Sequence, residues 1–171
     1  MKYCMDCGTE LIMKEHRTEG LIPFCPSCGA WRYPVFNTAV SMIVLNPAKD
    51  RVLLIQQYGK PSYILVAGYV NRGEDAEDAV AREIREEIGA EVAEIRFNHS
   101  RYFPPSNTLM LNFAAVLKDE ELHTNWEIDR CRWFSVEEAK ENIRPGSLAA
   151  AFLKGYFDRE FVWPKYPARQ D

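Results

Sequence analysis

The sequence predicts a mixed α/β protein in which a small cysteine-rich unit precedes one larger globular domain. Three observations predict this organisation: two Cys-x-x-Cys pairs near the N-terminus, several strand-like apolar runs, and one strongly amphipathic helical segment among those runs. We expect the cysteine-rich unit to span residues 1–34, the larger domain residues 35–160, and a C-terminal tail residues 161–171.

Composition and charge restrict the classes of function. The chain has 171 residues, of which 47% are hydrophobic, and this is enough to bury one ordinary core. Its formal net charge of -4 provides no overall basic field to hold a nucleic-acid backbone. No apolar run approaches the roughly 20 residues needed to cross a membrane, and the N-terminus lacks the pattern of a secretory signal. We therefore expect a cytoplasmic protein with no membrane partner.

Four of the five cysteines lie near the N-terminus, in two pairs that are separated by 17 residues. They are Cys4, Cys7, Cys25 and Cys28. This spacing is typical of a tetrahedral Zn²⁺ site, and the alternative is a redox pair or a set of loose thiols. Four thiolates leave no open coordination position, so the zinc is expected to be structural. The segment between the pairs is long enough only for a short hairpin, so metal binding should supply its folding free energy. Cys131 is expected to be a buried residue in a strand.

Hydrophobic periodicity locates the elements of the larger domain. Strands are expected at residues 39–45, 51–57, 63–66, 92–103, 108–117 and 131–134. Helices are expected at residues 74–88, 136–142 and 147–157, and Gly89 should end the first of them. Residues 164–171 are rich in proline and polar side chains, so we expect them to pack loosely.

The first predicted helix carries the pattern that points to chemistry. Glu83, Glu86 and Glu87 stand at positions i, i+3 and i+4, so their like charges share one helix face and destabilise an isolated helix. A hard cation such as Mg²⁺ or Mn²⁺ would relieve this repulsion and would also bind phosphate oxygens. A solvated helix face is the alternative, but only Arg82 and Arg85 are nearby cations. Arg82 has the geometry to orient one carboxylate through a bidentate pair.

The loop before this helix extends the pattern to a known motif. Gly68, then Glu74, then the run from Arg82 to Gly89 resemble the Nudix box, G-x5-E-x7-R-E-U-x-E-E-x-G-U, where U is a bulky aliphatic residue. The departure is Ala90 at the last U position. The resemblance implies an α/β/α sandwich around a mixed sheet and water attack on a nucleoside diphosphate linked to another group. It implies metal ligation and catalysis by the box glutamates, a bracing role for Arg82, and support of the loop by Glu74.

A four-cysteine zinc ribbon directly before a Nudix domain resembles the NADH pyrophosphatase branch of that family. The segments Ala67-Gly68-Tyr69-Val70 and Ser147-Leu148-Ala149 resemble that branch's A-G-F-V and S-I-A. This resemblance implies hydrolysis of NAD(H), or of a related small-molecule dinucleotide, to AMP and a mononucleotide. It also implies a homodimer, and a shortened form that lacks the branch's larger N-terminal domain.

The segment that selects the substrate in that branch departs from its pattern. Residues 100–110 align without a gap with S-Q-P-W-P-F-P-x-S-L-M, but only four positions are identical, and Arg101 replaces the glutamine. Arg130 stands where that branch has a second glutamate. Three interpretations of this replacement are open: it removes a metal ligand, it adds a cation for a more anionic substrate, or it is neutral drift in a loop. The residues expected to bind substrate are Gly68, Tyr69, Glu74, Arg101, Tyr102, Phe103 and Glu127.

Three alternative functions stay open at this point. In the first, the substrate is ADP-ribose or another nucleoside-diphosphate derivative. In the second, the enzyme removes an NAD-type cap from RNA, and RNA is a partner only as a capped substrate. In the third, the chain is a nucleotide-binding module that keeps a Nudix fold without turnover. The intact glutamates at positions 83, 86 and 87 argue against this last alternative.

Overall fold

The computed structural model describes residues 1–166, and the chain divides into two compact units after Phe36. The first unit, Met1–Phe36, is a three-stranded antiparallel sheet in the order β1-β2-β3. Its strands are β1 (Ile12–His16), β2 (Gly20–Cys25) and β3 (Ala30–Trp31). The β1–β2 pair is the short hairpin expected between the two cysteine pairs.

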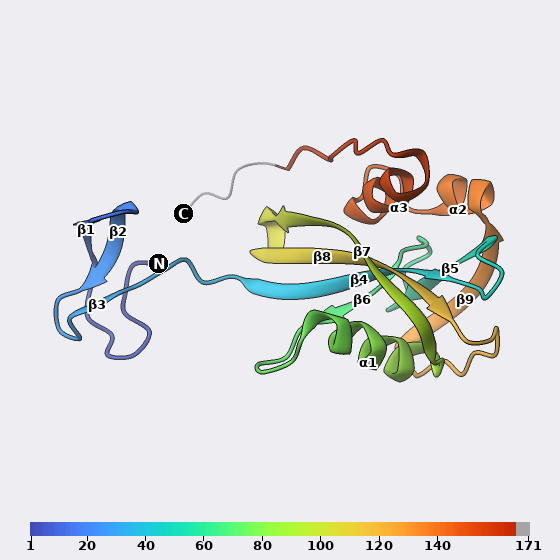
Figure 1. Ribbon diagram of the computed structural model, residues 1–171, viewed down its shortest axis with the longest axis horizontal. Coiled ribbons are helices and arrows are strands. Elements are labelled where there is room, and N and C mark those ends of the chain that lie inside the picture. Colours follow the sequence, from blue (N-terminus) through green and yellow to red (C-terminus); the bar gives the residue numbers. More distant parts are fainter. Residues whose placement is uncertain (167–171) are drawn as a thin grey trace. The chain divides into compact units, whose positions relative to one another are not determined.

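The second unit is built on a six-stranded mixed sheet (Figure 1). Its strands are β4 (Asn37–Leu45), β5 (Arg51–Gln57), β6 (Val66–Tyr69), β7 (Val92–Phe103), β8 (Thr108–Leu117) and β9 (Ile128–Ser135). The order is β7-β8-β4-β5-β9, and β6 pairs with β4. Strands β4 and β8 run parallel, whereas the other paired strands of this sheet are antiparallel.

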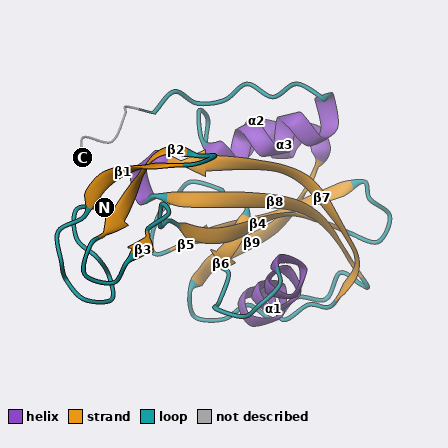
Figure 2. Ribbon diagram, turned by 60° about the vertical axis from the view of Figure 1, so that its left-hand side comes forward, coloured by secondary structure: helices purple, strands orange, loops and turns teal. Residues whose placement is uncertain are grey.

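Helices cover both faces of this sheet. Helix α1 (Ala76–Ile88) lies on one face, and α2 (Val136–Asn142) and α3 (Leu148–Asp158) lie on the other (Figures 1 and 2). A short 3₁₀ turn, η1 (Pro104–Ser106), joins β7 to β8. These layers confirm the expected α/β/α sandwich. Within residues 1–166, no helix is long and apolar enough to cross a membrane.

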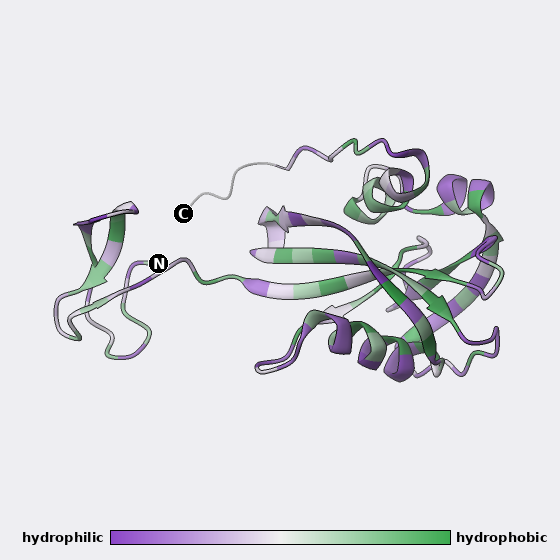
Figure 3. Cartoon of the chain, viewed as in Figure 1, coloured by the Kyte–Doolittle hydropathy of each residue, from purple (hydrophilic) through white to green (hydrophobic). Residues whose placement is uncertain are grey.

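The central strand β4 is buried on both faces, which explains its continuous apolar run. Val40 and Met42 belong to the core beneath α1, whereas Ile43 and Leu45 belong to the core beneath α2 and α3. Figure 3 shows hydrophobic residues along the central strands and hydrophilic residues on the outer surface of α1. The sheet therefore separates two cores, and α1 presents its polar face outward.

The sequence explains the buried face and the end of helix α1. Ile84 and Ile88 are fully buried, and the apolar stripe continues through Ala79 and Val80. Gly89 adopts φ 64° and ends the helix, since its N–H donates to the carbonyl of Arg85. The helix starts two residues later than predicted, at Ala76, because residues 74 and 75 still belong to the preceding loop.

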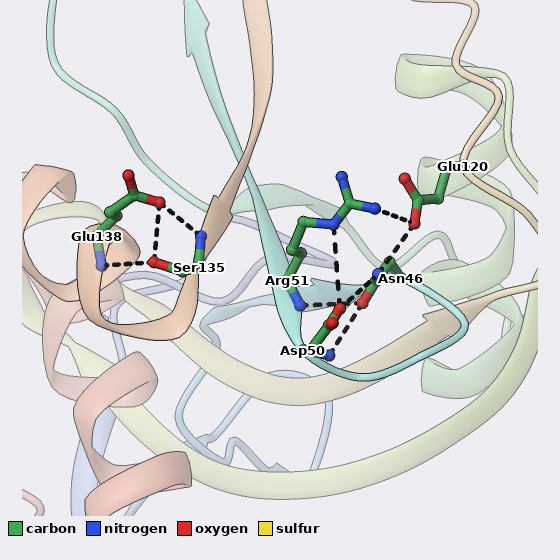
Figure 4. Close-up of polar contacts among 6 residues, drawn as sticks. All are labelled: Asn46, Asp50, Arg51, Glu120, Ser135 and Glu138. Atoms are coloured by element: carbon green, nitrogen blue, oxygen red, sulfur yellow. Dashed lines mark hydrogen bonds and ion pairs between the residues drawn. The ribbon is translucent and has the colours of Figure 1, made fainter.

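Polar side chains fix two turns at one end of the sheet (Figure 4). The buried Asn46 accepts hydrogen bonds from the backbone N–H groups of Asp50 and Arg51, at 3.1 and 3.0 Å, and this holds the β4–β5 turn. Ser135 and Glu138 form a capping box that starts α2. Strands β4 and β5 pair over only two residues each, because β6 takes the adjacent part of the β4 edge.

The expectation that residues 164–171 pack loosely is wrong for Tyr166. The ring of Tyr166 lies 4.9 Å from the ring of Phe103, measured between centroids, and the planes are nearly perpendicular. The segment after α3 therefore folds back onto the domain. Residues 167–171 of the predicted tail lie outside the described residues.

Candidate active site

Arg82 on α1 holds together the loop and the acidic face of the helix. Its guanidinium donates to both carboxylate oxygens of Glu74, at 2.7 and 2.9 Å. It also donates to Glu83 at 2.7 Å, to Glu86 at 3.0 Å, and to the backbone carbonyl of Tyr69 at 2.9 Å. One side chain thus fixes three of the carboxylates that the sequence singled out and one turn of the loop.

Glu74 is placed to support the loop. Its carboxylate also accepts the backbone N–H of Asn71 at 2.9 Å, so it closes the turn between β6 and α1. The hydrogen bonds from Arg82 are the main reason that the pKa of Glu74 is lowered to about 2. Glu74 therefore stays ionised, and both of its oxygens are engaged within the protein.

Gly68 leaves room for the carboxylate of Glu83. A Cβ atom at position 68 would overlap the carboxyl group of Glu83. Gly68 lies on β6, where it pairs with Val40 of β4, and the helix crosses directly beside it. The glycine is therefore required by the close approach of this strand to the helix.

Glu87 is the most unusual group in the site, because its carboxyl is buried among other acids. The residue is 6% exposed, and its Oε2 atom has no hydrogen-bond partner among the described residues. Burial, followed by the charges of Glu83, Glu127 and Glu86, raises the pKa of Glu87 to about 8. A buried oxygen without a partner, surrounded by three carboxylates, fits a hard divalent cation.

Residues far along the chain complete this acidic site. The Tyr58 hydroxyl donates to Glu127 at 2.7 Å, and this bond is the main cause of the raised pKa of Tyr58. The loop that carries Glu127 is attached to the end of α1, since the Asn125 N–H donates to the carbonyl of Glu87 at 3.0 Å. Sequence reasoning missed Tyr58, because only the β5–β9 pairing brings it near Glu127.

An apolar cavity of about 420 Å³ lies on the opposite side of the sheet from α1. It is lined mainly by apolar side chains, with Arg144 and two serines as polar groups. Ala67 lines the cavity, and the next residue of β6 is Gly68, which contacts the acidic site. Because neighbouring strand residues face opposite sides of a sheet, Ala67 and Gly68 show that the cavity and the acidic site lie on opposite faces of β6.

The predicted substrate-binding residues separate into two groups. Phe103 lines the apolar cavity, but Arg101 and Tyr102 line a different cavity of about 720 Å³ beside the C-terminal segment. The guanidinium of Arg101 lies over the ring of Trp163, 5.2 Å from its centroid. Tyr69 is 57% exposed and contributes its backbone carbonyl to Arg82. Sequence reasoning also missed Arg144 and Tyr166 in the cavity, although the motif at 147–149 indicated this region.

The cysteine cluster has the geometry of a zinc site. The Sγ atoms of the four cysteines all lie within 4.8 Å of one another, with 3.9 Å between Cys4 and Cys28 and 3.5 Å between Cys7 and Cys25. A tetrahedral zinc with bonds of about 2.3 Å requires sulfur atoms about 3.8 Å apart. Hydrogen bonding with Thr9 lowers the pKa of Cys7 to about 6, whereas hydrogen bonding with Cys7 and Cys25 raises the pKa of Cys28 to about 12, so the metal-free cluster favours one thiolate and keeps Cys28 protonated.

The carboxylate oxygens of the predicted Mg²⁺ or Mn²⁺ ligands, Glu83, Glu86 and Glu87, do not meet at one point as the cysteine sulfurs do. Within the described part of the chain, the cysteines are the cluster whose donor atoms meet, whereas Glu83 and Glu86 bond to the Arg82 guanidinium and Glu87 is buried separately from it. Cys131 is half-buried, and burial raises the pKa of its thiol.

Comparisons with known proteins place this geometry in a family. The NUDIX domain model matches residues 35–152. A protein from Pseudomonas aeruginosa named NAD-capped RNA hydrolase NudC is 36% identical over 161 residues, which cover 92% of this chain and 56% of that protein. NAD-capped RNA hydrolase NUDT12 from Macaca fascicularis is 31% identical over 160 residues, covering 89% and 35% of the two chains. The chain thus spans about half the length, or less, of these curated relatives.

Solved structures support the same fold. A NUDIX hydrolase from Nitrosomonas europaea superposes with a TM-score of 0.63 at 24% identity, covering 95% of this chain and 96% of that one. A MutT/nudix family protein from Enterococcus faecalis gives a TM-score of 0.53 at 31% identity, over 61% of this chain and 45% of that one. The family match covers more than half of the sequence and includes the acidic helix. The chain belongs to the NUDIX family.

Proposed function

We propose that this protein hydrolyses the diphosphate bond of NAD(H) or a related dinucleotide, with Mg²⁺ or Mn²⁺, to give AMP and a mononucleotide. The observation that carries the proposal is the carboxyl of Glu87, which is buried without a hydrogen-bond partner for Oε2 among other acidic side chains. A buried acid in this state destabilises the fold unless a cation or a proton compensates it. The site is therefore built to hold positive charge.

The residues divide into those that hold the metal and those that position them. Glu83, Glu86 and Glu87 would hold the cation, which when bound supplies neutralisation of phosphate charge and a lowered pKa for the attacking water. Arg82 positions Glu83 and Glu86 through its guanidinium. One of the three glutamates orients or deprotonates the water. Glu127 faces the same region from the β9 side, and Tyr58 positions it.

The apolar cavity supports a substrate that carries an aromatic base. Its volume suits a ring and a sugar, and Arg144 offers a cation for a polar substituent or a phosphate. Ala67 of β6 lines this cavity, and the neighbouring Gly68 faces the acidic site on the other face of the sheet, so a dinucleotide that occupies both would pass around the edge at β6. ADP-ribose and other nucleoside-diphosphate derivatives share the scissile bond and are alternative substrates.

Removal of an NAD-type cap from RNA is a second candidate, favoured by the names of the Pseudomonas and Macaca relatives. The reaction breaks the same diphosphate bond, and it additionally needs a basic path for the RNA chain. In the first unit, Arg32 is already engaged by Asp6 at 2.6 Å, and Lys14 lies over the ring of Phe24. These contacts leave few free cations there for RNA.

The first unit is proposed to be a structural zinc ribbon, with Zn²⁺ held by Cys4, Cys7, Cys25 and Cys28. Residues 1–34 form this ribbon, residues 35–160 the Nudix domain, and residues 161–171 a C-terminal tail.

Exposed apolar side chains in the ribbon and the adjoining connector, such as Leu21 and Tyr33, support a homodimer. The proposed location is the cytoplasm.

A substrate panel tests the proposed function. NADH, NAD, ADP-ribose, diadenosine polyphosphates and NAD-capped RNA are incubated with Mg²⁺ or Mn²⁺, and the products are separated by anion-exchange chromatography. We expect metal-dependent release of AMP from the dinucleotide, and loss of this activity in Glu86→Gln. The matched control is Glu77→Gln, which changes an exposed glutamate on the same helix outside the acidic site. Equal rates in Glu86→Gln and the wild type would refute the assignment.

Labelled water separates the enzyme from a non-catalytic nucleotide-binding module. Hydrolysis in H₂¹⁸O places one labelled oxygen in a product phosphate, detectable by mass spectrometry. A binding module would retain the nucleotide without incorporating the label.

A further inference from the structure

The C-terminal segment folds back across β7 through a row of aromatic contacts. The ring of His99 lies 4.6 Å from the ring of Phe161 and 5.0 Å from that of Trp163. Phe161 and Trp163 are stacked, with planes 21° apart, and Arg101 lies over Trp163. This segment lies beyond residue 152, where the match to the family model ends.

Helix α3 has a place for this segment. Gly155 on α3 has no side chain, and a Cβ atom there would overlap the ring of Phe161. The ring of Phe152, also on α3, lies 5.5 Å from that of Trp163. Two aromatic residues of the segment thus contact both α3 and β7, and this fixes the path of the chain up to residue 166.

Tyr166 arrives at the wall of the apolar cavity. Its ring meets that of Phe103 at 4.9 Å and 85°, and both residues line the cavity of about 420 Å³. Burial raises the pKa of the Tyr166 hydroxyl, which also makes a hydrogen bond with the backbone of Leu148 at the start of α3. The ring is therefore held at the wall from both sides.

We propose that Tyr166 is a specificity-determining residue, whose ring forms an aromatic wall of the cavity together with Phe103 and selects ligands that carry a flat base. The proposal rests on the proposed function, because the cavity then holds the base of the dinucleotide. The perpendicular rings of Tyr166 and Phe103 present one ring face and one ring edge to the cavity. A planar base can stack on the face and make an edge-to-face contact with the edge. Arg144, on the same cavity, complements a phosphate or a carbonyl oxygen attached to it.

Two variants isolate the ring from the hydroxyl. Tyr166→Phe and Tyr166→Leu both lose the hydrogen bond with Leu148, but only Phe keeps the ring. Binding of AMP, nicotinamide mononucleotide and ribose 5-phosphate is measured by isothermal titration calorimetry, without turnover. We expect Tyr166→Leu to bind at least one of the two nucleotides about 5- to 150-fold more weakly than Tyr166→Phe, as the loss of base stacking implies. Ribose 5-phosphate, which has no base, should bind both variants equally.

The outcomes separate this proposal from the proposed function. Equal nucleotide affinities in the two variants, an equal loss for ribose 5-phosphate, or no nucleotide binding by the wild type would each overturn the role of Tyr166. Failure of the wild type to hydrolyse any diphosphate, with ring-dependent binding intact, would instead refute the enzymatic function alone. Glu77→Gln, which changes an exposed glutamate of α1 outside the cavity, serves as the binding control, and thermal unfolding confirms that all variants are folded.

Discussion

The guanidinium of Arg82 donates to both carboxylate oxygens of Glu74, which stands eight residues earlier in the chain. This bidentate pair ties the loop after β6 to the second turn of α1. Glu74 thereby uses its oxygens within the protein, and the remaining donors of Arg82 are directed at Glu83 and Glu86. The loop and the acidic face of the helix are positioned as one unit.

Replacement of Arg82 by lysine should reduce catalysis much more than folding. Lysine keeps the charge, but a single ammonium group lacks the planar fork that reaches Glu74 and Glu83 together. We expect kcat to fall by about 10- to 100-fold, as is usual when a partner that orients metal ligands is lost. Steady-state kinetics at saturating Mg²⁺, with thermal unfolding as the control, provides the measurement. A kcat within twofold of the wild type would show that Arg82 is not required for positioning.

The pair should also make stability depend on pH in the acidic range. The pKa of Glu74 is about 2 in the folded protein, below its ordinary value of 4.5, because Arg82 stabilises the carboxylate. A lowered folded-state pKa gives stability that is complete above pH 4.5 and is lost as the pH falls toward 2. The difference in free energy of unfolding between the wild type and Glu74→Gln should therefore shrink between pH 5 and pH 3. Urea denaturation at both values measures it, and a constant difference would contradict the prediction.

Alanine at position 68 should disturb the acidic site directly. A Cβ atom there overlaps the carboxyl of Glu83, so either the strand or the glutamate must move. We expect a loss of activity of tenfold or more, since small displacements of catalytic groups are costly. Gly20→Ala is the control: Gly20 has φ +74° with open space around it, so alanine there costs roughly 1–2 kcal/mol of backbone strain without touching the site. Equal activity losses in the two variants would remove the special role of Gly68.

The cysteine cluster predicts one zinc ion per chain. Cys4→Ser should lower the zinc content measured by plasma mass spectrometry and should expose residues 1–36 to proteolysis, because this unit has too small a core to fold alone. Cys131→Ser is the matched control, since Cys131 lies on β9 of the second unit and is not a member of the cluster. Full zinc content in Cys4→Ser would exclude the four-cysteine site.

Local patterns predicted most elements of the fold, but the strand expected at residues 63–66 is wrong: β6 spans Val66–Tyr69, and Tyr63 and Ile64 form only isolated bridges. The alternation of apolar residues located β7 and β8 to the residue, and Gly89 marked the end of α1. The i, i+3, i+4 spacing correctly placed Glu83, Glu86 and Glu87 on one turn, because helix geometry is local. Such features depend on neighbours within a few residues, and one sequence contains them completely.

The features of the site that the sequence did not predict depend on contacts between residues far apart in the chain. Glu87 is buried whereas the side chain of Glu86 is 56% exposed, and the loop at 119–127 bonds to the backbone of Glu87 through Asn125. Arg101, which was predicted to bind substrate, lies over the ring of Trp163 from the folded-back C-terminal segment, a contact that the sequence did not indicate. Tyr58 meets Glu127 across 69 residues for the same kind of reason. No periodicity in the sequence encodes these pairings.

Binding of Mn²⁺ to the zinc-loaded protein, followed by electron paramagnetic resonance, tests the central claim most directly. We expect saturable Mn²⁺ binding in the wild type, at least tenfold weaker binding in Glu87→Gln, and unchanged binding in Glu77→Gln, which lies on the same helix. Mn²⁺ affinities that are equal in all three proteins would contradict a cation site on the acidic face of α1.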